Sequence, residues 1–204
     1  MAQRYDDALA AMQSRAQTLR TYTCRFISFA HGAEKDQDVT YRYYFKKPSS
    51  VRMEVQTGKY EGTVLLYTGS DVRVKPGHGI FSWFSFTFAP THRYVCDVRG
   101  NGLHQSSWLW YITEHARMQR QTRSSFAGFT EIGGRKALKF DLASTDPAKT
   151  NSVAREELWI DAQYSVPLQY KQYDAGGMLI QSGRYEEVVI DCEIPDSLFT
   201  EFDR

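Results

Sequence analysis

The sequence lacks any strong excess of one charge. Its 204 residues include 25 Lys and Arg against 24 Asp and Glu, which leaves a formal net charge of +1. Proteins that bind nucleic acids through the phosphate backbone carry a strongly basic surface. The composition therefore argues against a nucleic-acid binder, and we expect no nucleic acid among the partners.

Cysteine is scarce and widely spaced. Cys24, Cys96 and Cys192 are the only three, and none belongs to a C-x-x-C pair. This spacing excludes a zinc ribbon and a thioredoxin-type site. One disulfide plus a free thiol stays open, but we prefer three buried thiols, because cysteine is among the residue types most often buried.

Long apolar runs are missing as well. No stretch approaches the ~18 apolar residues of a membrane-spanning helix. The early run from Ala8 to Met12 is too short for the apolar region of a signal peptide. The protein is thus either cytosolic or one whose export signal has been removed, and composition does not choose between them.

The sequence has no pattern typical of a metal, cofactor or catalytic site. The glycines of Lys75-Pro-Gly-His-Gly79 lack the Lys and Ser/Thr of a phosphate loop, and there is no G-x-S-x-G motif. His92 and Cys96 lie in a segment with Pro90, where four-residue spacing gives no support for a catalytic dyad. The five histidines are His31, His78, His92, His104 and His115. No two of them have the spacing of metal ligands on a helix.

Two pairs of adjacent carboxylates could suggest acid–base chemistry. Glu156-Glu157 and Glu186-Glu187 are neighbours in segments that read as strands, so the two members of each pair point to opposite faces. A solvated exterior explains them better than a catalytic pair. We therefore expect a protein that is not an enzyme and needs no cofactor.

Aromatic residues are abundant, with 13 Tyr, 12 Phe and 4 Trp, and most fall in segments with a two-residue period. Val51, Met53 and Val55 alternate with charged neighbours, and Gly133-Gly134 is a two-residue turn of the kind that twisted hairpins prefer. The chain reads as one domain over residues 1–204 with a long antiparallel meander. Its parts are an amphipathic helix at 1–20, strands at 21–74, an inserted aromatic segment with a lid helix at 75–120, and strands at 121–204.

The inserted segment breaks the regular pattern. Five aromatic residues fall between Phe81 and Phe88, and their alternation slips by one position between Trp83 and Phe84, as a bulge or break would produce. A second helix is predicted at about residues 103–120. Glycines and Pro90 could act as hinges, so we expect residues 80–120 to form a movable apolar gate. A buried hairpin and an exposed contact patch are the alternatives for the aromatic run.

Several short motifs, in this order and spacing, resemble the outer-membrane lipoprotein-sorting (LolA/LolB-like) superfamily, in a branch of its own. The resemblance spans nearly the whole chain. Its motifs are Thr21-Tyr-Thr23, Phe45-Lys-Lys-Pro48, Val64-Leu-Leu-Tyr-Thr-Gly-Ser-Asp71, Leu158-Trp-Ile-Asp161, Val166-Pro-Leu168, Tyr173-Asp-Ala-Gly-Gly-Met178 and Ile194-Pro-Asp-Ser-Leu-Phe199.

The resemblance implies an α+β fold that is mainly β, namely an unclosed antiparallel β-barrel with a helical lid. It also implies a monomeric carrier in the periplasm or cell envelope that holds acyl chains of lipid or lipoprotein in an apolar cavity, with its signal sequence removed. The membrane surface or an envelope protein could be a further partner. The alternative is a regulatory envelope sensor that binds lipid or peptide and signals through a protein partner; such a sensor would carry a second domain or a lasting partner surface.

The resemblance also implies individual roles. In the family's carrier, an Arg before the Pro that follows the second strand helps to hold the lid shut; here that position is Lys47, which lacks the planar fork of Arg. The expected lipid-binding residues are apolar positions of the strands and of the inserted segment. They are Tyr43, Phe45, Val51, Met53, Val55, Phe84, Phe86, Trp108, Ile112, Leu138, Phe140 and Leu158. A filled core is the alternative for the strand positions, because alternation alone does not distinguish a core from a cavity.

Overall fold

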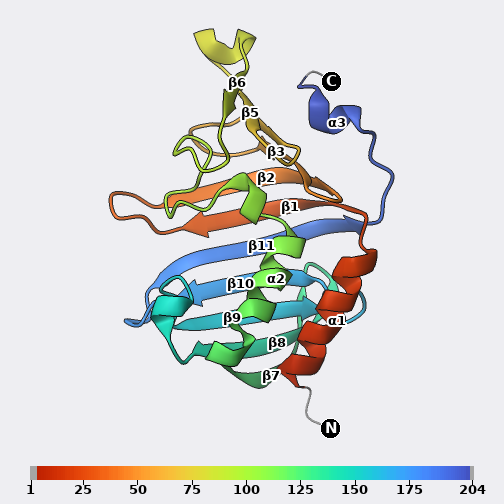
Figure 1. Ribbon diagram of the computed structural model, residues 1–204, viewed down its shortest axis with the longest axis vertical. Helices are drawn as coiled ribbons and strands as arrows, with labels where there is room; N and C mark the ends of the chain where they lie inside the picture. The colour runs from red at the N-terminus through yellow and green to blue at the C-terminus, as the bar shows by residue number, and fades with distance from the viewer. Residues whose placement is uncertain (1–3, 203–204) are drawn as a thin grey trace. The chain divides into compact units, whose positions relative to one another are not determined.

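The computed structural model describes residues 4–202, and strands dominate this part of the chain (Figure 1). Its eleven strands form one antiparallel sheet in the order β6-β5-β4-β3-β2-β1-β11-β10-β9-β8-β7. The order ends at β6 and β7, so the sheet is open. The predicted fold class, an unclosed antiparallel β-barrel fold with helices, is confirmed.

The chain divides into two compact units. Unit 1 contains residues 1–18 and 108–186, and unit 2 contains residues 19–107 and 187–204. Each unit is therefore assembled from segments that are distant in sequence. The expectation of a single domain over residues 1–204 stays a prediction.

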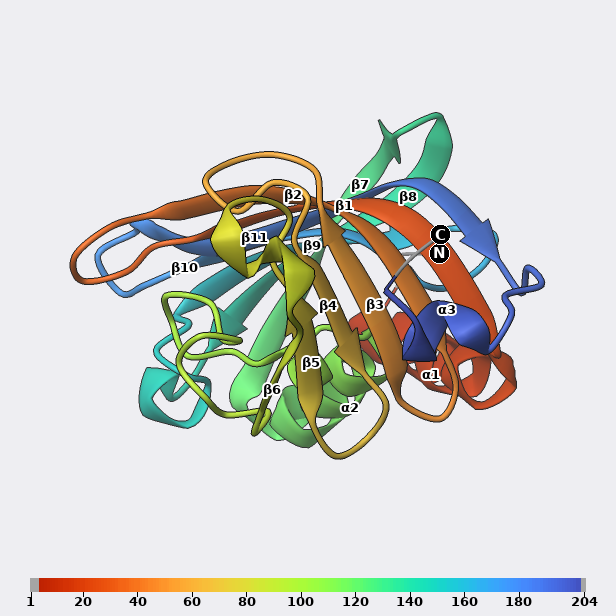
Figure 2. The same ribbon diagram turned by 90° about the horizontal axis from the view of Figure 1, so that it is seen from above.

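Unit 2 is a meander of short strands. Consecutive strands pair antiparallel from β1 through β6, and β3, β4 and β5 lie side by side (Figure 2). The strands are β1 (Thr21–Ala30), β2 (Gln37–Lys46), β3 (Ser50–Val55), β4 (Val64–Tyr67), β5 (Val72–Lys75) and β6 (Phe86–Phe88), and the short helices are η1 (Ile80–Trp83), η2 (Leu103–Gln105) and α3 (Ser197–Thr200).

Unit 1 combines two helices with longer strands. The helices are α1 (Tyr5–Thr18) and α2 (Trp108–Met118), which pack against each other. The other elements are η3 (Gln119–Gln121), β7 (Thr122–Ile132), β8 (Arg135–Ser144), η4 (Pro147–Lys149), β9 (Arg155–Asp161), β10 (Pro167–Tyr173) and β11 (Leu179–Ile190), whose last four residues belong to unit 2.

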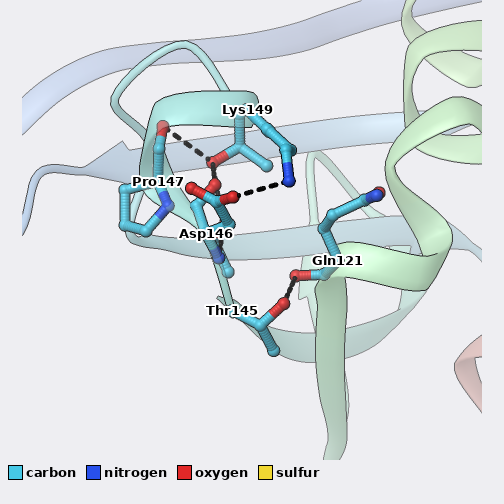
Figure 3. A network of polar contacts seen from close by, with 7 residues as sticks. Gln121, Thr145, Asp146, Pro147 and Lys149 are labelled. Atoms are coloured by element: carbon cyan, nitrogen blue, oxygen red, sulfur yellow. Dashed lines mark hydrogen bonds and ion pairs between the residues drawn. The ribbon is translucent and has the colours of Figure 1, made fainter.

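Turn chemistry sets the ends of the unit 1 hairpins. Gly133 and Gly134 join β7 to β8 with φ of 56° and 77°, a left-handed conformation that glycine adopts without strain. At the other end of this hairpin, Thr145 Oγ1 donates to Gln121 O at 3.1 Å, and Lys149 Nζ lies 2.9 Å from Asp146 Oδ2 (Figure 3). The first contact joins the residue after β8 to η3, and the second lies at the turn of η4.

The two predicted helices are shorter than expected. The first was predicted at residues 1–20, of which 1–3 lie outside the described residues. The helix ends at Thr18, and β1 begins at Thr21. The second was predicted at about 103–120, but only Trp108–Met118 is α-helical. Residues 103–105 form a separate 3₁₀ turn, in which the backbone N of Gly102 donates to Gln105 Oε1 at 2.8 Å. No helix in residues 4–202 combines the length and apolar character needed to cross a membrane.

Candidate lipid-binding faces

One face of the unit 2 sheet carries continuous apolar rows across its strands. Residues opposite each other in an antiparallel pair project from the same face. Tyr43 lies opposite Met53, and the row continues through Leu65 and Val74 to Phe86 at the edge strand. The rows beside it contain Tyr22, Phe45, Val51, Tyr67, Val72 and Phe88, and Phe26, Tyr41 and Val55. We call this the unit 2 apolar face, and it brings together six of the expected lipid-binding residues.

The burial of the row from Tyr43 to Phe86 falls toward the edge of the sheet. Tyr43 and Met53 are buried, Leu65 and Val74 are half-buried, and Phe86 is 38% exposed. Tyr22 stacks on Tyr43 and Phe45, with ring centroids 5.5 and 5.1 Å apart. The row therefore changes from close aromatic packing at β1 and β2 to accessible apolar surface at β6.

The segment around η2 covers part of the same face. The Tyr43 hydroxyl lies 3.1 Å from Ser106 Oγ, and the Tyr67 and His104 rings are 6.2 Å apart. Burial raises the pKa of Tyr43 well above its usual range, despite the opposing effect of the Ser106 hydrogen bond.

The opposite face of the same strands is occupied by the C-terminal segment. Arg52, Leu66 and Arg73 form a row there, and α3 packs against β3 and β4. The buried Arg52 guanidinium donates from Nη1 to Leu198 O at 2.9 Å and to Glu201 O at 2.7 Å, and its Nε lies 2.6 Å from Glu54 Oε1. The apolar face is thus the side of the unit 2 sheet away from α3.

Unit 1 has an apolar face of its own, which the helices cover. Phe140 lies opposite Leu158 and next to Leu138 on the same face, and all three side chains are buried. Tyr5 of α1 packs on Phe140, with ring centroids 5.6 Å apart. On α2, Trp108 and Ile112 are both buried, and Trp108 packs edge-on against Tyr185 at 5.4 Å. The five expected lipid-binding residues of unit 1 therefore lie in its helix-covered interior.

A buried carboxylate lies on this unit 1 face, and the expectation of a solvated Glu156 is wrong. Glu156 is 5% exposed because it pairs across to Leu142 and Gln172, on the side that faces α2. The Tyr111 hydroxyl donates to Glu156 Oε1, and Gln172 Nε2 donates to Oε2 at 3.1 Å. Glu157 projects to the other face beside Lys139 and Arg155, so the predicted separation of the two carboxylates is confirmed.

His115 extends this polar cluster to the first helix. Its Nδ1 lies 2.7 Å from the Tyr5 hydroxyl, and its Nε2 lies 3.4 Å from Glu156 Oε1 without the alignment of a hydrogen bond. Burial, followed by the nearby Glu156 charge, raises the pKa values of Tyr5 and Tyr111 well above their usual range. Sequence analysis missed this cluster because its members come from four separate elements.

The inserted aromatic run is exposed. Residues 80–83 form a 3₁₀ turn and residues 86–88 a short strand, so the slip in alternation between Trp83 and Phe84 is a break between two elements. Phe84 lies in the break and is 61% exposed. Of the alternatives for this run, the structure excludes the buried hairpin.

Lys47, the expected latch residue, lies in the turn between β2 and β3. Its backbone N donates to Arg20 O at 2.8 Å, and its side chain is exposed. The neighbouring Lys46 Nζ instead contacts Ile194 O at 3.1 Å and Asp196 Oδ1 at 2.7 Å. A role for Lys47 as a latch stays a prediction.

The expectation of three buried thiols is wrong for two of them. Cys24 is buried, whereas Cys96 and Cys192 are half-buried, and all three are free. Their separate positions on β1, beside Pro90 and after β11 exclude a disulfide in this structure. Within residues 4–202 no three His, Cys, Asp or Glu side chains are grouped as a metal ion would require.

No protein-family model and no curated protein sequence matches this chain. Solved structures do match its fold. An uncharacterised conserved protein from Thermus thermophilus superposes with a TM-score of 0.59 and 12% identity, over 99% of this chain and 96% of the other. The lipoprotein LppX of Mycobacterium tuberculosis gives a TM-score of 0.52 and 10% identity, over 94% and 99%.

Structures of MucB match as well. In the MucA/MucB complex of Pseudomonas aeruginosa, the TM-score is 0.55 with 10% identity, over 95% of this chain and 60% of the other, so this chain spans about three fifths of that one. A LolA superfamily protein from Nitrosomonas europaea matches at a lower TM-score of 0.42. The matches with a TM-score above 0.5, at 10–12% identity, show a shared fold.

Proposed function

We propose that this protein is a periplasmic or envelope carrier that binds acyl chains of a lipid or lipoprotein on its apolar faces and catalyses no reaction. The observation that carries the proposal is the unit 2 row from Tyr43 to Phe86, which stays apolar across five strands while its burial falls. The side chains of a filled core are buried, whereas this row stays apolar at positions that are partly exposed. The fold that this chain shares with the lipoprotein LppX supports the same function.

The lipid-binding residues of the proposal are those expected from the sequence. On unit 2 they are Tyr43, Phe45, Val51, Met53, Val55, Phe84 and Phe86, and on unit 1 Trp108, Ile112, Leu138, Phe140 and Leu158. Residues 80–120 keep their proposed role as a gate. Gly79 and Gly100 have φ of 82° and 85°, and a Cβ at either would meet no atom within 4 Å, so both positions suit a hinge.

The free energy of burying methylene groups explains how such a carrier can hold a lipid and release it. An acyl chain of about 14 methylenes gains roughly 11 kcal/mol when it leaves water for an apolar surface. The same chain gains almost nothing when it leaves a bilayer for the protein, since both surroundings are apolar. A carrier can therefore hold lipid in an aqueous space and still release it to a membrane, without a strong polar anchor.

A bulky side chain on the apolar row tests the proposal. Leu65→Trp should block an acyl chain and weaken binding of a fluorescent fatty acid by about tenfold or more, because it fills the space beside Met53 and Val74. Val64→Trp is the matched control, since Val64 is half-buried on the same strand but opposite Glu54, on the other face. Equal binding by both variants, with the wild-type circular dichroism spectrum, would contradict the proposal.

The second candidate is an envelope sensor that signals through a protein partner. The shared fold with MucB, solved in complex with MucA, favours it. The two functions differ in which molecule should copurify with the protein. Organic extraction of protein purified from a bacterial envelope, followed by mass spectrometry, should release stoichiometric acyl lipid from a carrier; a stable protein partner without lipid would favour the sensor.

A further inference from the structure

A cluster of large apolar side chains is exposed at one end of unit 2. Figure 1 shows η1, in yellow, beyond the ends of β5 and β6. We call Ile80, Phe81, Trp83, Phe84 and Phe86 the aromatic tip; their exposed fractions are 77, 58, 87, 61 and 38%. Contiguous exposed apolar groups of this size mark interaction sites on most proteins.

The aromatic tip is an ordered element rather than a loose loop. The backbone N of Phe84 donates to Phe81 O at 3.1 Å, and Ser82 Oγ donates to Gly79 O at 2.8 Å. The Phe81 and Phe86 rings meet edge to face, with centroids 6.2 Å apart. The exposed side chains are therefore held outward by a hydrogen-bonded turn.

The loop between β3 and β4 supports the tip from one side. Gly77 packs so closely on it that a Cβ would lie 2.3 Å from the carbonyl carbon of Gly62, and His78 Nδ1 lies 3.1 Å from Glu61 O. This contact places Lys59 and Tyr60 beside the residues that lead into η1. Tyr60 is 55% exposed, and Lys59 Nζ lies 5.5 Å from its ring centroid.

The charge around the tip is mostly positive. From Val72 to Cys96 the sequence contains no Asp or Glu, but it contains Arg73, Lys75 and Arg93. Arg73 is engaged with Thr200 O and the Phe202 ring, whereas Lys59 and Arg93 lie against exposed tyrosines. Glu61 is the acidic residue of the supporting loop. The surroundings of the tip are therefore basic, although the whole chain is nearly neutral.

We propose that the aromatic tip, flanked by Lys59 and Lys75, docks the protein on an anionic lipid bilayer. Trp, Tyr and Phe are favoured at the membrane–water interface, where an apolar ring meets acyl chains and its edge meets headgroups. Lys and Arg side chains near an anionic leaflet strengthen the attraction to it. A bilayer needs no shaped counterpart to accept a projecting turn, and the basic rim matches anionic headgroups. This docking does not depend on what the apolar faces hold.

Vesicle flotation with the full chain tests the docking. Wild-type protein should float with phosphatidylcholine vesicles that contain phosphatidylglycerol, and much less with pure phosphatidylcholine. The double variant Ile80→Ser/Trp83→Ser should bind the anionic vesicles at least about tenfold more weakly, because two exposed apolar side chains, neither of them among the proposed acyl-binding residues, no longer enter the interface. Both residues are mostly exposed, so the folded state should persist, as circular dichroism will show.

The control is Phe129→Ser, which removes a ring of similar exposure, 57%, from β7 of unit 1. This variant should float like the wild type. A second arm, Lys59→Gln/Lys75→Gln, should lower binding to anionic vesicles and reduce its salt dependence, with no change on phosphatidylcholine.

Three results would overturn the proposal. The first is equal flotation of the tip variant and the wild type, and the second is an equal loss of vesicle binding in Phe129→Ser. The third is a dimer of the wild-type protein, seen by light scattering, that the tip variant abolishes. The last result would make the tip a contact between two copies of the chain. Binding of the fluorescent fatty acid is measured in parallel, so that failure of acyl binding and failure of docking are seen separately.

Discussion

Glu156 shows how a single residue can depart from the pattern that predicts its strand. Its position on β9 follows the two-residue period, and that period was enough to separate it from Glu157. Its burial comes from α2, which supplies Tyr111 and His115 over the sheet. A buried carboxylate is tolerated only when its oxygens accept hydrogen bonds. No local pattern in the sequence predicts hydrogen-bond donors that come from another element.

Removing one donor should therefore destabilise the protein. Tyr111→Phe deletes the hydroxyl that donates to Glu156 Oε1. This oxygen then lies beside His115 Nε2 without the hydrogen bond from Tyr111. We expect the free energy of unfolding, measured by urea denaturation, to fall by about 1–3 kcal/mol.

Tyr173→Phe is the control for Tyr111→Phe. Its hydroxyl lies 3.4 Å from Glu157 Oε2 on the accessible face, where water can replace the hydrogen bond. The control should change stability by no more than about 0.5 kcal/mol. If the two variants were equally stable, Glu156 would not depend on Tyr111.

Among the elements, those with strong local signals were predicted well. The two-residue period and the turn glycines located β3, β7 and β8, because these strands are set by their own alternation and by adjacent turns. The helix predicted at 103–120 was too long. Residues 103–106 are not part of α2, and His104 and Ser106 contact Tyr67 and Tyr43 instead. The short α3 was not predicted, because a helix of four residues has no periodicity to detect.

The position of α3 depends on one buried cation. Arg52→Met keeps an unbranched, largely aliphatic side chain but removes the donors to Leu198 O and Glu201 O. Because these carbonyl groups would lose their partner, we expect a loss of about 3 kcal/mol, the upper end of the cost for an unsatisfied buried group. Hydrogen exchange should rise in residues 194–202.

Arg42→Met controls for the loss of a positive charge. Arg42 is exposed on β2, and its guanidinium lies 6.0 Å from the Tyr44 ring centroid. Exchange in residues 194–202 should stay at the wild-type rate in this variant. Protection of that segment in Arg52→Met would show that α3 is held by Leu198 and Phe199 rather than by Arg52.

At the scale of the whole molecule, the sequence predicted the fold class but not how distant segments combine. Alternation identifies strands one at a time, whereas each unit here joins two segments that are distant in sequence. The backbone N of Asp191, for example, donates to Thr21 O at 2.8 Å, across 170 positions. The candidate faces were predicted as sets of apolar positions, and the hydrogen-bond register then showed which positions form one row.

Buried tyrosines make the whole protein sensitive to alkali. Burial is the main cause that raises the pKa of Tyr41 to about 12 and the pKa values of Tyr5, Tyr43 and Tyr111 still further. In the unfolded chain these phenols ionise near pH 10, while in the folded chain they stay neutral. Rising pH therefore favours the unfolded state from about pH 10 upward, by about 1.4 kcal/mol per pH unit for each tyrosine.

We expect cooperative unfolding within about one to three pH units above 10, because a domain of ordinary stability has 5–15 kcal/mol to lose. Absorbance at 295 nm and circular dichroism, recorded on the same samples, check this. The four tyrosines should ionise only as the β-sheet signal disappears, and Tyr41→Phe should move the transition to higher pH because it removes one ionisation from the unfolded state. Ionisation of all 13 tyrosines near pH 10 with the sheet intact would mean that these phenols are open to water in the folded protein.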